Sequence, residues 1–205
     1  MLNKGNKNSL QQRRRPPAGF KQALQGLAFW IGYKNELYNN HNLFEGAISN
    51  EFIPLLKVHL SKEYVISQEE FYRELTKKKS KKFTDDRIDI CIYKRDKKNI
   101  EKLDSIIEFK RYSSSDSNLI ADLEYLSEFK RLNAYVRCFL VITSQSGFPK
   151  KLLNDNGNGK NWRKINYNKK LEKSHTKILE VYKAYVSKSL KRSPFVFLLE
   201  VFSNE

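Results

Sequence analysis

The stretches Arg87-Ile88-Asp89-Ile90-Cys91-Ile92-Tyr93 and Ser105-Ile106-Ile107-Glu108-Phe109-Lys110-Arg111-Tyr112 decide the expected fold of this 205-residue chain. Both runs are rich in isoleucine, a β-branched residue typical of buried strands. The connection between them, Lys94–Lys102, is short and charged, and Lys97-Lys98-Asn99 suits a turn. The two runs are therefore predicted to pair as a hairpin.

The second run carries charged residues between apolar ones. Side chains two positions apart in a strand point to the same face of the sheet. Glu108 and Lys110 are therefore predicted to share one face, and Ile107 and Phe109 to share the opposite face.

In the first run, the same alternation predicts that Ile88, Ile90 and Ile92 lie on one face and Asp89 on the other. Pairing of the two strands then places Asp89 beside Glu108. Two carboxylates that converge in a sheet repel each other unless a cation lies between them. Mg²⁺, held by one or two carboxylates with water and phosphate oxygens, meets that need, and we expect Mn²⁺ to substitute for it.

This pattern resembles the PD-(D/E)xK nuclease superfamily, which has the restriction-endonuclease-like fold. Asp89 and the run Glu108-Phe109-Lys110 carry the resemblance, which covers roughly residues 43–145. The proline that names the motif is absent, and Ile88 stands before Asp89. The resemblance implies an α/β domain with a mixed β-sheet flanked by α-helices on both sides.

The resemblance also implies roles for particular residues. Asp89 and Glu108 would bind one or two metal ions together with the backbone carbonyl of Phe109, and Lys110 would act on the attacking water or on the transition state. In this family, a helix before the first core strand often adds an acidic ligand. Glu45 and Glu51 are the candidates here, and we prefer Glu45.

A different interpretation of the same residues is a surface ion pair, because most Glu–Lys neighbours in strands contribute little beyond solvation. The isoleucines on either side of Asp89 and Glu108 argue against an exposed face. We therefore favour a metal site.

The composition favours a folded protein with a polyanionic partner. The formal net charge is +16, and 40% of the residues are hydrophobic. The basic residues lie in several blocks, which favours nucleic acid over a membrane as the partner. No apolar run approaches the length of about 18 residues that a membrane helix needs. The three histidines form no ligand cluster, which argues against zinc.

Cys91 and Cys138 lie in predicted strands without the spacing of a metal or redox motif. They are expected to be buried free thiols of a reducing compartment. We therefore expect a soluble cytoplasmic protein.

Several basic segments are predicted to contact phosphates. Residues 1–20 are expected to form a flexible basic arm, and residues 146–195 hold thirteen basic residues against three acidic ones. The predicted nucleic-acid contacts are Arg13, Arg14, Arg15, Lys77, Lys78, Lys79, Lys81, Lys82, Arg111, Lys169 and Lys170. For the lysine block of residues 77–82, a solvated loop is the alternative.

The remaining pattern predicts one domain over residues 21–205, with a core at about 43–145 and a basic extension at 146–205. Apolar spacing predicts a helix that breaks at Gly32, and a second helix with Asn42 as a possible cap and Pro54 as a kink or division. A strand over residues 64–75, a helix over 119–129, a parallel strand over 135–143, a helix over 178–190 and a strand over 194–202 follow.

Taken together, the sequence predicts a Mg²⁺-dependent DNA endonuclease. A non-catalytic nucleic-acid-binding module and an interaction subunit on a nuclease-like fold are the alternatives. RNA stays open as a substrate, and so does action as a homodimer or within a larger nuclease complex.

Overall fold

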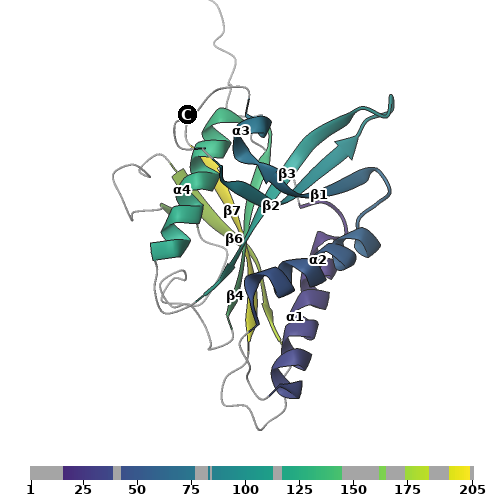
Figure 1. The fold of residues 1–205 in the computed structure, drawn as a ribbon, viewed down its shortest axis with the longest axis vertical. Helices are drawn as coiled ribbons and strands as arrows, with labels where there is room; N and C mark the ends of the chain where they lie inside the picture. Colours follow the sequence, from purple (N-terminus) through teal and green to yellow (C-terminus); the bar gives the residue numbers. More distant parts are fainter. Residues whose placement is uncertain are drawn as a thin grey trace, which may run out of the picture.

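The computed structural model describes residues 16–38, 43–76, 83, 85–112, 117–144, 162–164, 174–184 and 194–203. Within them the chain forms a mixed seven-stranded sheet with helices packed on both faces (Figure 1). The helices are α1 (Phe20–Leu37), α2 (Glu45–His59), α3 (Tyr72–Leu75) and α4 (Ser117–Leu132). The strands are β1 (Tyr64–Phe71), β2 (Arg87–Arg95), β3 (Glu101–Arg111), β4 (Arg137–Ser144), β5 (Trp162–Lys164), β6 (Ser174–Lys183) and β7 (Phe195–Ser203). Their order across the sheet is β1-β2-β3-β4-β7-β6-β5, which confirms the α/β class.

The predicted hairpin is confirmed as the antiparallel pair β2–β3, with Ile90 opposite Ile107. Its turn is closed by Asp96, whose Oδ1 accepts hydrogen bonds from the amides of Lys98 and Ile100. Asn99 adopts a left-handed backbone with φ of 61°, a conformation that asparagine tolerates better than most residues. The turn sets the register as far as Tyr93 and Leu103, and an extra residue in β3, Asp104, then shifts it by one before Ile92 pairs with Ser105.

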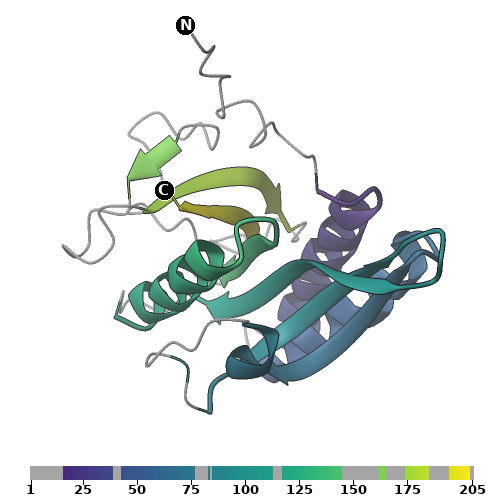
Figure 2. The ribbon, with the colours of Figure 1, turned by 90° about the horizontal axis from the view of Figure 1, so that it is seen from above.

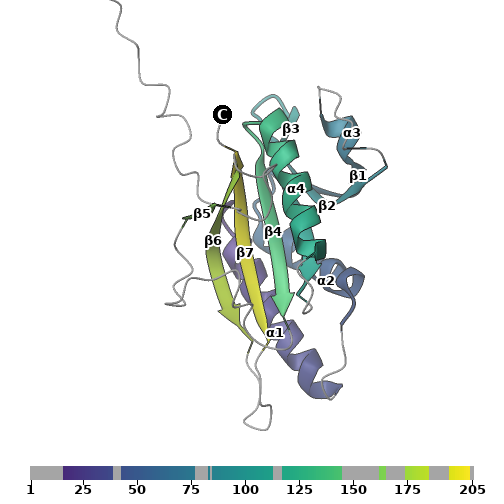
Figure 3. The same cartoon turned by 90° about the vertical axis from the view of Figure 1, so that its left-hand side faces the viewer.

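The predicted crossover is also confirmed. After β3 the chain passes through α4 and returns in β4, which pairs with β3 in parallel and sets Glu108 opposite Leu140. All eight residues of β4 are buried, as expected for a strand that is covered on both faces. Figure 3 shows α4 lying across β4 and β7, with α1 on the other side of the strands.

Two hydrophobic layers hold the sheet between the helices. One layer joins the apolar face of α4, including Leu123, Leu126 and Phe129, to the strands. The other joins α1 and α2 to the opposite face, where Ile107 and Phe109 lie as predicted. Figure 2 shows the hairpin of β2 and β3 extending over α1 and α2. The face of β3 opposite to Ile107 and Phe109, which carries Glu108 and Lys110, is therefore the face toward α4.

The prediction that three isoleucines of β2 share one face is wrong for Ile88. Ile90 and Ile92 pack in the layer of α1 and α2, whereas Ile88 packs with Cys91 in the layer of α4. The side-chain alternation is therefore broken around Asp89. The ladder between β1 and β2 pairs Gln68 with Ile90 and Glu70 with Ile88 but leaves Asp89 unpaired, and Glu69 has a positive φ of 55°. The ladder is therefore irregular at Asp89.

The structure contradicts the predicted break at Gly32, the possible cap at Asn42 and a division of the second helix at Pro54. Helix α1 continues through Gly32, which is buried, to Leu37; packing outweighs the cost of about 1 kcal/mol for a glycine within a helix. Helix α2 has Phe44 at its N-cap position, and Asn42 lies outside the described residues. Pro54 does not divide α2, which is one continuous helix with Phe52 and Leu56 buried on either side of the proline.

The predicted helix over residues 178–190 is wrong in its described part, because residues 174–183 form strand β6. The register against β7 shifts between Ile178 and Glu180, so Leu179 is an extra residue in the strand. The bulge sends Ile178 and Val181 to one layer and Leu179 and Tyr182 to the other. Apolar residues therefore recur three and four positions apart, which imitates the period of a helix.

Other predictions have mixed outcomes. The strand predicted over residues 64–75 is β1 up to Phe71, after which α3 begins. Helix α1 begins at Phe20, a fully buried residue, so the predicted basic arm ends before residue 20; residues 1–15 lie outside the described residues. Cys91 and Cys138 are buried free thiols, as predicted. Among the described residues, the helices lack the length and apolar character needed to cross a membrane.

A buried ion pair joins β4 to β7 and gives a prediction about stability. The guanidinium of Arg137 donates to both carboxylate oxygens of Glu200 at 2.7 and 2.8 Å, and both residues are buried. Glu200→Leu leaves a buried, unpaired charge and should lower the free energy of unfolding by about 3–5 kcal/mol, as measured in urea. Adding Arg137→Met should restore most of the loss; if it does not, the loss does not come from the unpaired charge.

Candidate active site

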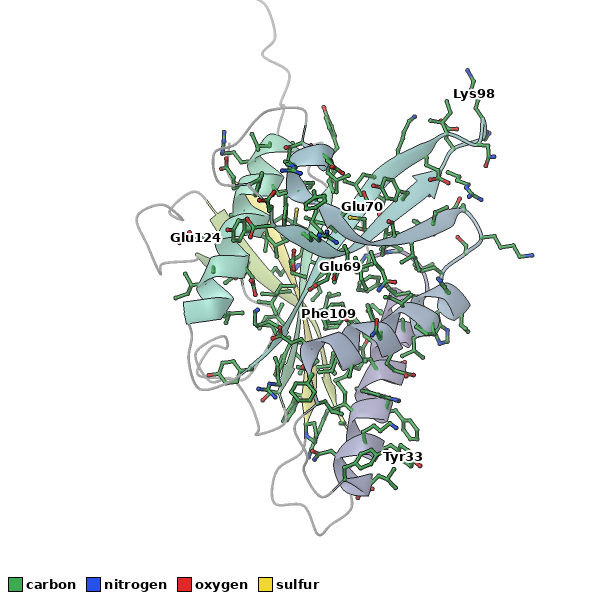
Figure 4. All side chains as sticks on the ribbon, viewed as in Figure 1. Tyr33, Glu69, Glu70, Lys98, Phe109 and Glu124 are labelled. Carbon is green, nitrogen blue, oxygen red and sulfur yellow. The ribbon has the colours of Figure 1, made fainter. Side chains whose placement is uncertain are left out.

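Strands β2 and β3 bring the two predicted carboxyl groups together. One oxygen of Asp89, Oδ2, accepts a hydrogen bond of 2.7 Å from the backbone amide of Phe109. The carboxyl groups of Asp89 and Glu108 lie close enough together for the charge of Asp89 to raise the pKa of Glu108. Figure 4 labels Phe109, the neighbour of Glu108 on β3, near the middle of the view, and Asp89 and Glu108 are both half-buried. The hairpin register is therefore what creates the pair.

Burial and proximity make this pair electrostatically costly. Burial raises the pKa of Glu108 well above its ordinary value, and the charge of Asp89 raises it further. Burial also raises the pKa of Asp89, although the hydrogen bond from Phe109 opposes that shift. Two buried acids in contact favour having one proton, or a cation, between them. The pair therefore suits a bound cation.

Lys110 lies two residues after Glu108, and acidic groups from two helices hold its ammonium. Its Nζ is 3.0 Å from Oδ2 of Asp122 on α4 and 3.7 Å from Oε2 of Glu45 on α2. Burial lowers the pKa of Lys110, but the carboxylates outweigh this effect and leave that pKa above its ordinary value. The side chain is 18% exposed. Lys110 is therefore a fixed, charged ammonium.

Of the two predicted helix glutamates, the structure joins Glu45 to strand β3. Glu45 begins α2, and its Oε1 accepts a hydrogen bond of 2.7 Å from the amide of Arg111. A carboxylate in the first turn of a helix is also favoured by the helix dipole. Glu45 raises the pKa of Asp89 through its charge, but its contacts go to Lys110 and Arg111. A role for Glu45 as a metal ligand stays a prediction.

Sequence reasoning missed two residues of this site, Asp122 and Tyr72. Burial raises the pKa of Asp122 to about 6, although the ion pair with Lys110 opposes that shift. An acid within the apolar stripe of α4, between Leu119 and Leu126, was the signal for it. The hydroxyl of Tyr72 donates a hydrogen bond of 2.6 Å to Oε1 of Glu108. No sequence signal marked Tyr72, because the contact spans 36 positions.

The donor set can be tested against the proposed metal. Among the described residues, no three His, Cys, Asp or Glu side chains are gathered closely enough to hold a metal ion by themselves. Mg²⁺ commonly binds through only one or two carboxylates and completes its shell with water and phosphate oxygens. Asp89 and Glu108 fit that pattern, with the backbone carbonyl of Phe109 as the third donor that the resemblance implies.

The predicted phosphate contacts are mostly outside what the structure describes. Arg13, Arg14, Arg15, Lys77, Lys78, Lys79, Lys81, Lys82, Lys169 and Lys170 all lie outside the described residues. Arg111 is described and half-buried, and its guanidinium donates to the carbonyl of Leu43 at 3.4 Å. It lies beside Glu45, at the edge of the site.

Comparison with known proteins does not assign this chain to a family. Protein-family models, curated proteins and solved structures were all searched, and none matches this chain. A function must therefore be argued from the residues themselves.

Proposed function

We propose that this chain is a metal-dependent endonuclease of the PD-(D/E)xK type, with a restriction-endonuclease-like core, that hydrolyses phosphodiester bonds in DNA. The observation that carries the proposal is the contact between Asp89 and Glu108, with Lys110 on the same strand face. Hard oxygen donors beside a fixed ammonium are the groups that phosphodiester hydrolysis requires. The mixed sheet with helices on both faces and a parallel crossover supports the proposed core.

The residues have distinct roles in this proposal. Asp89 and Glu108 bind the divalent cation, Mg²⁺ or in its place Mn²⁺, and the carbonyl of Phe109 is the third predicted donor. A bound cation of this kind lowers the pKa of water and neutralises charge on the scissile phosphate. Lys110 is charged and held by Asp122, so it orients the attacking water or stabilises the developing negative charge. A charged lysine does not accept the proton of that water.

The ion pair between Lys110 and Asp122 also favours a second candidate function. Asp122 and Glu45 already neutralise Lys110, which would also suit a purely structural role. The chain would then be an interaction subunit or a nucleic-acid-binding module on a nuclease-like fold. The two carboxyl groups argue against this candidate, because they repel phosphate unless a cation is bound.

Incubation of the purified chain with supercoiled plasmid separates these candidates. An endonuclease should convert the plasmid to nicked or linear DNA with Mg²⁺ and should stop when EDTA is added. Binding in a gel-shift assay without any cleavage in Mg²⁺ or Mn²⁺ would favour the second candidate. An RNA of the same sequence, tested alongside, shows whether the substrate is restricted to DNA.

The lysine block at residues 77–82 gives a prediction about affinity. It precedes β2 by a few residues, so it lies near Asp89 in the chain. Replacing Lys77, Lys78 and Lys79 with glutamine should flatten the slope of log K against log salt. The expected change is up to about 2.7, at roughly 0.9 for each phosphate contact on duplex DNA. The matched change at Lys169, Lys170 and Lys173 should have a smaller effect; an unchanged slope for the first variant would make the block a solvated loop.

A further inference from the structure

Tyr72 connects the candidate active site to an aromatic cluster that belongs to other elements. It begins α3 and is 2% exposed. Its ring stacks on Phe83, with ring centroids 4.9 Å apart, and contacts Tyr125 and Phe129 of α4 at 5.8 and 5.6 Å. The ring is therefore confined on several sides.

The two polar ends of Tyr72 are also fixed. Its backbone amide donates to the carbonyl of Asp86, just before β2, at 3.1 Å. Its hydroxyl donates to Oε1 of Glu108 at 2.6 Å. A buried phenol needs a hydrogen-bond partner, and here the partner is the carboxyl that also contacts Asp89. The rigid ring thus holds one oxygen of Glu108 in place.

We propose that Tyr72 is a positioning residue of the metal site, whose hydroxyl orients the Glu108 carboxyl for binding a divalent cation. The proposal rests on the proposed function, because it takes Glu108 to be a ligand. A neighbour that hydrogen-bonds a ligating group fixes its orientation, and loss of such a neighbour typically weakens metal binding by 10- to 100-fold. Tyr72 has the geometry of such a neighbour.

Tyr72→Phe is the direct test, because it removes one oxygen atom and keeps the stacked ring. Tyr182→Phe is the matched control: the hydroxyl of Tyr182 donates to Glu180 at 3.3 Å on β6, which β4 and β7 separate from β3. Both variants lose a hydrogen bond from tyrosine to a carboxylate, but only Tyr72 contacts a proposed ligand.

The measurement is calorimetric titration of the full chain with MnCl₂ and with MgCl₂, alongside urea unfolding in EDTA. Tyr72→Phe should raise the Kd for Mn²⁺ by about 10-fold or more, and its cleavage should recover at higher Mg²⁺ concentration. Tyr182→Phe should keep the wild-type Kd. Adding Tyr72→Phe to Glu108→Ala should change the Kd no further, because the side chain through which the hydroxyl acts is already gone.

Two outcomes would overturn the proposal in different ways. A wild-type Kd for Tyr72→Phe, in a chain that binds Mn²⁺ and cleaves DNA, would make Tyr72 a core residue only and would leave the nuclease function intact. A wild-type chain that binds neither cation and does not cleave would overturn the nuclease function, and the positioning role with it. The Glu108→Ala background separates a loss of stability from both outcomes: there a purely structural effect of Tyr72→Phe would still raise the Kd, whereas a positioning effect would not.

Discussion

Asp89→Asn or Glu108→Gln is expected to lower the rate of Mg²⁺-dependent DNA cleavage by about 10³-fold or more. Each change removes a charge that binds the cation, while the amide oxygen can still accept the hydrogen bond from Phe109 or from Tyr72. Metal-ion catalysis contributes several kcal/mol, and a loss of about 4 kcal/mol corresponds to about 10³-fold in rate. Single-turnover cleavage of supercoiled plasmid with excess protein measures the effect.

Affinity and stability distinguish this loss from simple damage to the fold. Affinity for DNA should be unchanged or higher, because one phosphate-repelling carboxylate is gone. Stability in EDTA should not fall, because each variant removes an acid whose charge is unfavourable at its buried position. Glu101→Gln is the control: it lies on the same strand, but its exposed carboxylate pairs with Arg95 at 3.0 Å. Wild-type cleavage by either Asp89→Asn or Glu108→Gln would exclude that carboxylate as a ligand.

The part of the fold that the sequence predicts correctly depends on local patterns. Strands β2 and β3 alternate apolar and charged residues, and the turn at Asp96–Asn99 has residues suited to it. The apolar spacing of α4 and the buried run of β4 then predict a parallel crossover. Each of these features is set by neighbouring residues, so each is visible without a structure.

The errors arise where tertiary structure changes the local pattern. The bulge at Leu179 gives β6 the spacing of a helix, and nothing in the sequence marks a bulge there. Ile88 changes face where the ladder between β1 and β2 is irregular, at Glu69 and Asp89. Gly32 stays helical because α1 is packed against the sheet. In each case, packing overrides the local preference.

The candidate site also combines features that local sequence patterns predict with features that only the folded chain creates. The spacing of Glu108 and Lys110 on one strand is a local feature, and the hairpin places Asp89 beside them. Tyr72 and Asp122 reach the site from α3 and α4, so only the assembled fold brings them there. Glu45 was one of two possible helix acids, and its contact with the amide of Arg111 distinguishes it from Glu51.

Lys110→Met is expected to lower the rate of the chemical step by about 10²–10⁴-fold, with little change in affinity for DNA. The ammonium is held by Asp122 at 3.0 Å and stays charged, since the carboxylates raise the pKa of Lys110 despite its burial. It therefore contributes as a positive charge near the transition state. Methionine keeps most of the side-chain length and removes that charge. Single-turnover rates and binding curves, measured on the same plasmid, separate the two effects.

Two further variants show whether position or charge alone matters. Lys102→Met removes a lysine at the other end of β3, where the ammonium pairs with Asp96 at 3.2 Å, and should cleave at the wild-type rate. Asp122→Asn keeps the positive charge of Lys110 but removes the negative charge of the carboxylate that holds it. This variant should therefore reduce the rate less than Lys110→Met does. A loss confined to affinity in Lys110→Met would show instead that Lys110 only contacts phosphate. Transition-state stabilisation would then have to come from the cation held by Asp89 and Glu108 alone.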